Sequence, residues 1–369
     1  MSIWAVLAAI AVLALLIVVH ELGHFMAARL QGIYANRFSL GFGPVLWKYQ
    51  GPETEYAVRA FPLGGYVGFP DDDPDSDIPP NDPNLLRNRP VLDRAIVISA
   101  GVIANLIFAY LILVIQFGLV GIPAGFDYQP GVLVKQVLSE NSAASQAGIK
   151  VGDIILSVDG KELGATKEAS SLLTKEIQNH PNQPMAFSIK RNAEIISLPI
   201  TPKLEQDGKG HIGVGLNPNG TIVRQRAKNI VEAFTTSAQE YQRIIVLTVQ
   251  GFGQLISNFG ETASQVAGPV KIVQEGAKIA GTDATALFQF AAIISINLAI
   301  INILPLPALD GGQLAFLLIE GLRGKPLPTE VQQNVMQTGL VLLLGLGIFL
   351  IVRDTANLIP TSWVQNLFQ

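Results

Sequence analysis

The chain of 369 residues contains no cysteine. Disulfide bonds, thiolate zinc ligands and cysteine nucleophiles are therefore excluded, and a metal site would have to use His, Asp and Glu. Charged residues are scarce, at 15% of the chain, and the mean hydropathy is +0.39. Soluble proteins of this length are less apolar, so the composition indicates a membrane protein. The small net charge of −4 gives no reason to expect nucleic-acid binding.

Four predominantly apolar runs are long enough to cross a membrane as helices. The first extends from Ile3 to about Leu30, and the others lie between Arg94 and Asp127, between Asp283 and Asp310, and between Glu330 and Arg353. Each exceeds the ~20 residues that span ~30 Å of hydrocarbon. A shorter stretch, 244–260, contains glycine and glutamine, and we expect an interfacial helix there rather than a span.

The first apolar run continues without a break into His20-Glu21-Leu22-Gly23-His24. On a helix, His20 and His24 lie one turn apart on the same face, so both imidazoles can bind one zinc ion. Glu21 lies beside them, where it can accept a proton from a zinc-bound water. The HExxH pattern is common by chance, but ionisable residues in a membrane helix are costly and are retained mainly for function. The alternative is a pair of helix-end histidines at a membrane surface.

A catalytic zinc needs a third protein ligand. The third apolar run ends in the segment 302–312, where Pro305 and Pro307 must break the helix. Asp310 follows this break and precedes two glycines that allow close approach, so it is a candidate ligand; a helix cap is its alternative role. His180 and His211 are rival ligands, but they lie in the large segment between the second and third runs.

Lysine and arginine indicate the orientation of the spans. They flank the loops 31–93 and 321–329, which we therefore place in the cytoplasm, with both termini and the segment 127–283 outside. The HExxH motif and Asp310 then fall toward the same, cytoplasmic side of the membrane. This agreement favours a shared metal site.

Two regions outside the spans have the patterns of folded structure. Residues 37–69 alternate as short strands and predict a small β hairpin or sheet directly after the first span. Residues 128–203 combine short strands, a helix near 168–179 and Gly-Asp turns, which predict a compact α+β module. Its segment 147–160, AGIKVGDIILSVDG, resembles a PDZ domain. The resemblance implies a groove, ending near 131–133, that binds peptide C-termini by strand addition; a steric filter is the alternative role.

The predicted fold is a mainly α membrane protein with four transmembrane helices, a small β region after the first and an inserted α+β PDZ domain. Its predicted parts are as follows: 1–126, the first two spans with the zinc motif and the β region; 127–204, the PDZ-like domain; 205–282, a linker with interfacial amphipathic helices; and 283–369, the last two spans with the third ligand.

Taken together, HELGH on the first span, the PDZ-like insert and Leu306-Pro307-Ala308-Leu309-Asp310-Gly311 resemble the site-2 protease family of intramembrane zinc metalloproteases, most closely its bacterial regulator-of-sigma-E type. The resemblance implies Zn²⁺ on His20, His24 and Asp310, with Glu21 as the catalytic base. It also implies substrate contacts, for which the candidates are Asn302, Gly64, Gly65 and Asn105. The chain departs from the family at Val102, where many members carry proline.

This resemblance predicts hydrolysis of peptide bonds within the transmembrane segments of single-span proteins, such as a membrane-bound anti-sigma factor or signal-peptide remnants. It predicts a multi-pass protein of the bacterial plasma (inner) membrane, surrounded by the lipid bilayer and with the PDZ domain outside the cytoplasm. A membrane-anchored quality-control zinc protease and a non-enzymatic PDZ scaffold are the alternatives.

Overall fold

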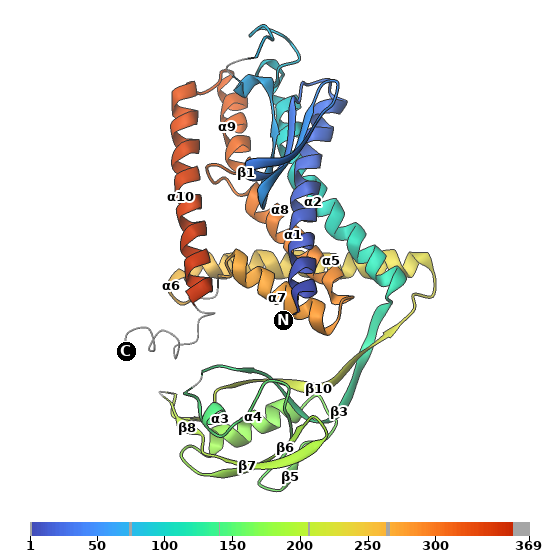
Figure 1. The fold of residues 1–369 in the computed structure, drawn as a ribbon, viewed down its shortest axis with the longest axis vertical. Coiled ribbons are helices and arrows are strands. Elements are labelled where there is room, and N and C mark those ends of the chain that lie inside the picture. The colour runs from blue at the N-terminus through green and yellow to red at the C-terminus, as the bar shows by residue number, and fades with distance from the viewer. Residues whose placement is uncertain (1, 74–75, 140, 206, 263–265, 357–369) are drawn as a thin grey trace. The chain divides into compact units, whose positions relative to one another are not determined.

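The computed structural model describes residues 2–73, 76–139, 141–205, 207–262 and 266–356 (Figure 1). The chain forms two compact units. Unit 1 comprises Met1–Val120 and Arg226–Gln369, and unit 2 comprises Gly121–Gln225.

Unit 1 is built mainly from helices. They are α1 (Ile3–Leu30), α2 (Val91–Leu119), α5 (Ile230–Ser257), α6 (Phe259–Thr262), α7 (Pro269–Thr282), α8 (Ala286–Ile303), α9 (Asp310–Arg323) and α10 (Thr329–Ala356), with the 3-10 turns η1 (Pro70–Asp72) and η2 (Leu86–Asn88). Within the described ranges, α1, α2, α8 and α10 are long and apolar enough to cross a membrane. These four helices coincide with the four apolar runs of the sequence.

The stretch 244–260, expected to lie at the interface, belongs mostly to α5. This helix begins at Ile230, where Asn229 caps it by accepting a hydrogen bond from the Glu232 amide at 2.8 Å. α5 is not among the helices that qualify as spans. In Figure 1 it runs across the direction of α1 and α10. Its buried residue Ile244 packs against α2 and α8, while several of its large apolar residues remain exposed.

The helices of unit 1 approach closely where their side chains are small. A Cβ atom at Gly23 on α1 would lie 2.4 Å from the Ala100 carbonyl oxygen on α2. Elsewhere α1 packs Ala5 and Ala9 against Ala277 of α7. Such contacts are typical of membrane helices, which associate through close backbone approach rather than through the exclusion of water.

The β region of unit 1 consists of β1 (Arg37–Gln50) and β2 (Glu55–Gly68). Both strands bend, so that segments of one pair with segments of the other in three places. Residues 55–58 pair in parallel with 37–40 and antiparallel with 47–50, while 65–68 pair antiparallel with 37–40. Four short segments therefore form one small mixed sheet, and 65–68 lie at an edge of it. The predicted β region after the first span is present.

Unit 2 is an α+β module. Its elements are β3 (Ile122–Val137), α3 (Ala143–Gln146), β4 (Ile154–Val158), β5 (Lys161–Glu162), α4 (Ala169–Asn179), β6 (Met185–Arg191), β7 (Glu194–Ile200), β8 (Lys203–Leu204), β9 (Gly210–His211) and β10 (Val214–Gln225). The main sheet has the order β10-β3-β4-β6-β7, with β5 paired to β4. Leu173 of α4 and Phe187 of β6 are fully buried in its core.

The structure corrects the predicted position of the peptide groove. Val132 and Leu133 pair with β10 on one side and with β4 on the other, so their backbone groups are not available to a peptide. The sequence gives no signal that β10, 81 or more residues later, inserts beside β3. Because β10 is an edge strand and lies beside β3, the free edge on this side of the sheet is that of β10. The pairing of β10 with β3 also extends this unit to Gln225, beyond the range 127–204 and into the range 205–282 that was predicted to begin with a linker.

Candidate metal centre

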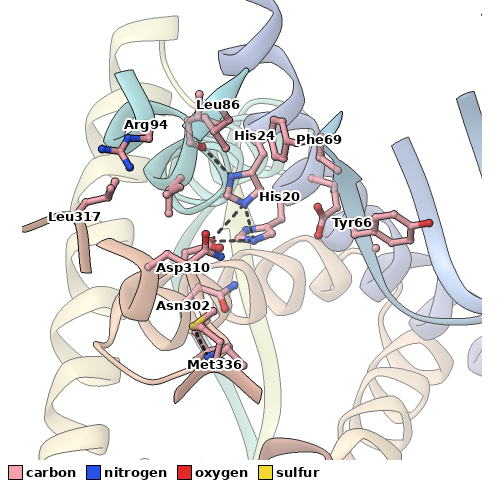
Figure 2. A pocket seen from close by; sticks show the side chains of 18 of the residues that line it. His20, His24, Tyr66, Phe69, Leu86, Arg94, Asn302, Asp310, Leu317 and Met336 are labelled. Carbon is pink, nitrogen blue, oxygen red and sulfur yellow. Dashed lines mark hydrogen bonds and ion pairs between the residues drawn. The ribbon is translucent and has the colours of Figure 1, made fainter. Parts of the chain in front are cut away.

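Side chains from α1 and from the start of α9 converge in unit 1 (Figure 2). The Asp310 Oδ2 atom lies 3.3 Å from His20 Nε2 and 3.4 Å from His24 Nε2. The two Nε2 atoms lie 3.2 Å apart. Among the described residues, these three form the one cluster of His and carboxylate groups that could hold a metal ion.

The spacing of these three atoms fits zinc. Two ligands bonded to zinc at about 2.0–2.1 Å in tetrahedral geometry lie about 3.3 Å apart, and the three observed distances are 3.2, 3.3 and 3.4 Å. The Asp310 Oδ2 atom is buried and accepts no hydrogen bond. A buried carboxylate oxygen without a donor is costly unless a cation completes it. The donor set of two imidazoles and one carboxylate leaves a fourth position for water.

The chain break before α9 brings Asp310 to the histidines. α8 ends at Ile303, and the backbone then extends through Pro305 and Pro307, which cannot continue the helix. α9 restarts at Asp310 with Leu309 as its N-cap, and no side chain caps the helix. Asp310 therefore does not act as the helix cap, which was the alternative role considered for it from the sequence. Gly311 is needed for this return, because a Cβ atom there would lie 2.1 Å from the Leu304 carbonyl oxygen.

One face of α2 lies behind both imidazoles. The Val97 carbonyl oxygen lies 2.8 Å from His24 Nδ1, and the Asn105 side chain approaches His20 Nδ1, with Nδ2 at 3.4 Å. Between them in sequence, Gly101 leaves the space that the rings occupy, since a Cβ atom there would lie 2.3 Å from His24 Nε2. α2 thus supports the candidate ligands without supplying one.

Glu21 faces the edge of the small β sheet. Its carboxylate interacts with the backbone amide of Val67, and a Cβ atom at Gly65 would lie 2.8 Å from Glu21 Cγ. Glycine at position 65 thus permits the sheet to approach the glutamate. Gly64 adopts φ +154° in the same segment, which suits glycine.

A cavity of about 950 Å³ contains the metal-binding candidates and Glu21. All four residues predicted to contact substrate border it, namely Gly64, Gly65, Asn105 and Asn302. Figure 2 shows Asn302 of α8 close to Asp310. His180 and His211, the rival ligands, belong to unit 2 and are not part of this cluster.

Several residues around the cavity were not predicted from the sequence. Arg94 of α2 and Glu320 of α9 form an ion pair that borders it, and polar groups at this border could admit water. Met336 of α10 accepts a hydrogen bond from the Ala308 amide, with Sδ at 3.3 Å. Gly101, four residues before Asn105 in an apolar helix, carried a signal, because a glycine in such a helix often marks a close approach. The other contacts join segments that are distant in the sequence, and no local pattern of residues indicated them.

The chain matches a model of peptidase family M50 over residues 8–346. It is 66% identical to a protein of Nostoc sp. (strain PCC 7120) that is named provisionally as a zinc metalloprotease, covering 99% of this chain and 100% of that one. It is 51% identical to the chloroplastic membrane metalloprotease ARASP of Arabidopsis thaliana, covering 96% of this chain and 79% of that one. It is 30% identical to the regulator of sigma-E protease RseP of Salmonella typhimurium, covering 94% and 98%.

A PDZ domain of an SdrC-like protein from Listeria innocua aligns with 24% of this chain and 96% of its own, at 20% identity and a TM-score of 0.21. That score is too low to establish the fold of unit 2, and the PDZ assignment rests on the resemblance of 147–160.

Four apolar helices and these relatives define an integral membrane metalloprotease. The chain belongs to peptidase family M50, and its cofactor is Zn²⁺. The family recognised from the sequence is thereby confirmed.

Proposed function

We propose that this protein hydrolyses peptide bonds within the transmembrane segments of single-span membrane proteins, and that His20, His24 and Asp310 bind its zinc. The observation that carries the proposal is the convergence of these three ligand atoms, 3.2–3.4 Å apart. Two of them lie on α1, a helix apolar enough to span a membrane, and Asp310 follows the end of α8, another such helix. A completed ligand set and the intact Glu21 also count against a non-enzymatic scaffold.

The residues of the site have separate roles in this proposal. When bound, zinc brings the pKa of its water to about 7 and stabilises negative charge on the peptide carbonyl. Glu21 takes the proton from the attacking water and delivers it to the leaving amine. The Asn302 side chain, which borders the cavity, donates a hydrogen bond to the substrate backbone.

The sheet edge at 64–67 serves as the binding strand for unwound substrate. Because Asn36 donates its amide hydrogen to the Gly68 carbonyl, and strand residues alternate, Gly65 and Val67 direct their backbone groups away from the sheet and toward the cavity. The Val67 amide on this side interacts with Glu21, so Gly65 and the Val67 carbonyl remain for substrate. An unwound transmembrane segment exposes N–H and C=O groups, each costing several kcal/mol in lipid. Strand addition at this edge would satisfy them.

Synthetic transmembrane peptides test this strand addition. N-methylation of single amides beside the scissile bond should raise KM at every second position, because alternate amides of a strand face its partner. Peptides methylated at the intervening positions are the matched controls. Equal effects at all positions would contradict the proposal.

Unit 2 has a free edge suited to peptide capture. A cavity of about 200 Å³ lies between α4 and the segment 210–216, and Ile177, Gly213 and Leu216 line it. We place the groove for peptide C-termini here, with steric exclusion of bulky ectodomains as the second role of this unit. We also propose that the protein lies in the plasma (inner) membrane. The arrangement of basic residues supports an orientation with unit 2 outside the cytoplasm.

The decisive experiment compares membrane proteomes of cells that produce the wild type, Glu21→Gln or the control Glu275→Gln, which changes an exposed glutamate of α7. Glu21→Gln should retain zinc and accumulate uncut stubs of single-span proteins, while the control should match the wild type. Zinc-loaded Glu21→Gln without such stubs would refute intramembrane cleavage. Accumulation of unfolded soluble proteins instead would favour the quality-control alternative.

A further inference from the structure

Asn105 occupies an unusual position for a residue expected to contact substrate. It is fully buried, with 0% of its surface exposed. Its backbone carbonyl accepts a hydrogen bond from Ser295 Oγ of α8 at 2.8 Å, which ties this turn of α2 to a second helix. Its side-chain Oδ1 is buried and has no hydrogen-bond partner. A buried amide oxygen without a donor demands an explanation.

The explanation lies in the protonation of His20. His20 Nε2 faces Asp310 and His24 Nε2, so this nitrogen is the one that can bind zinc. A neutral imidazole that binds metal through Nε2 carries its hydrogen on Nδ1. His20 Nδ1 must therefore donate, and Asn105 is the side chain in reach, at 3.4 Å.

The Asn105 amide satisfies this donor when it is rotated by 180°. The nitrogen and oxygen of an amide are nearly equal in shape, and the hydrogen-bond partners decide between the two orientations. With Nδ2 toward His20, two donors face each other and Oδ1 stays unpaired. With Oδ1 toward His20, the Nδ1 hydrogen and the amide oxygen pair with each other.

His24 shows the same arrangement on the neighbouring turn. Its Nδ1 lies 2.8 Å from the Val97 carbonyl oxygen, so an oxygen acceptor of α2 already holds that ring. Val97, Gly101 and Asn105 are spaced by four residues and share one face of α2. This face gives each imidazole an oxygen acceptor, with the glycine between them making room.

We infer that Asn105 is a positioning residue that accepts a hydrogen bond from His20 Nδ1 and so fixes the tautomer and the orientation of this zinc ligand, instead of contacting substrate. The inference rests on the proposed zinc ligands. Loss of such an acceptor typically weakens metal binding 10- to 100-fold. The same loss should leave the binding of substrate by the zinc-loaded protein unchanged.

Zinc affinity of the full-length protein in detergent, measured by competition with a chelator, tests the inference. Asn105→Leu removes the acceptor at nearly constant volume and should weaken zinc binding about 10- to 100-fold. Asn105→Asp keeps an oxygen acceptor and should restore the affinity to within a few-fold of wild type. Gln116→Leu, a buried polar residue farther along α2, is the matched control and should bind zinc normally. The spectrum of bound Co²⁺ should change with Asn105→Leu and return with Asn105→Asp.

Two results would overturn the inference. One is wild-type zinc affinity in Asn105→Leu, or in the smaller Asn105→Ala if the leucine variant fails to fold. The other is an Asn105→Asp variant that binds zinc no better than Asn105→Leu. A raised KM with unchanged zinc affinity in Asn105→Leu would instead assign Asn105 to substrate binding. Asp310→Ala distinguishes the two proposals. If Asp310→Ala loses zinc and the Asn105 variants do not, the proposed metal site stands and only this inference is removed.

Discussion

Unit 2 buries large side chains in one continuous core, whereas the helices of unit 1 meet in smaller clusters that are rich in alanine. Among the described residues, the core of unit 2 contains sixteen buried ones, including Phe187 and Leu173. In the part of unit 1 that the structure describes, the largest cluster has five buried residues, and two of these are Ala109 and Ala292. The apolar surface of α10 is hardly covered by protein, since only 6% of its most apolar 18-residue stretch is buried.

This difference reflects the surroundings of each unit. A core that excludes water gains free energy with every apolar group that it buries, so large side chains stabilise it. Lipid is as apolar as leucine, so helices in a membrane gain little from burying large side chains and rely on close contact and on polar groups. Enlarging a small residue should therefore be most harmful in unit 1, and truncating a large one in unit 2.

The largest effect is expected for Gly23→Leu. A side chain at this position would collide with the Ala100 carbonyl oxygen, 2.4 Å from its Cβ, and force α1 away from α2. Since α1 carries His20 and His24, bound zinc and proteolytic activity should both be lost. Gly345→Leu on α10 is the control, because no atom lies within 4 Å of a Cβ there. Zinc content after purification in detergent measures both, and normal zinc in Gly23→Leu would refute the packing argument.

Phe187→Ala should destabilise unit 2 by about 3–5 kcal/mol, because it leaves a cavity in a closed core. Hydrogen exchange of unit 2 amides in the full-length protein measures the loss. The same truncation at Phe349 of α10, which is 60% exposed, should leave those amides unchanged. A fall in zinc content with Phe187→Ala would show that the metal site depends on the folding of unit 2.

A smaller effect is expected for Met336→Leu. Ala308 adopts φ +69°, which is strained for a residue with a side chain, and its amide donates to the Met336 sulfur. Loss of this acceptor leaves the amide unpaired two residues before Asp310, so zinc affinity should fall about tenfold. Met26→Leu, a change of an exposed methionine on α1, should have no effect. Unchanged affinity in Met336→Leu would show that the turn holds its shape without the sulfur.

The smallest effect concerns the ion pair between Asp153 and Arg191 in unit 2. Burial by itself raises the pKa of Asp153, but hydrogen bonds from Arg191 and from the Lys150 amide hold that pKa below its usual value. Because the folded pKa is lowered, the pair stabilises unit 2 above the unfolded pKa of about 3.9, and this contribution disappears as the pH falls through the folded value.

Asp153→Asn should therefore lower the stability of unit 2 at pH 7 and reduce its dependence on pH in the acid range. Thermal unfolding of the full-length protein at pH 7 and near pH 3 measures both quantities. Glu194→Gln, at an exposed position of β7, is the control. An equal loss at both pH values would assign the effect to packing rather than to charge.

Much of the architecture could be predicted from local patterns. The four spanning helices follow from apolar runs, and the two imidazoles on one face follow from the i, i+4 spacing of His20 and His24. The strands of 37–69 follow from alternation. Each of these features depends on residues within one or two turns, for which periodicity is informative.

The sequence by itself determined the membrane class, the helical HExxH motif and the candidate third ligand, since composition and short spacings encode them. The tertiary structure alone decided that Asp310 comes within 3.4 Å of the histidines, that the face of α2 at Val97 and Asn105 backs their rings, and that β10 covers the segment near Gly131. These contacts join residues 73 to more than 280 positions apart. Their formation depends on how whole helices and strands pack, which no local pattern of residues records.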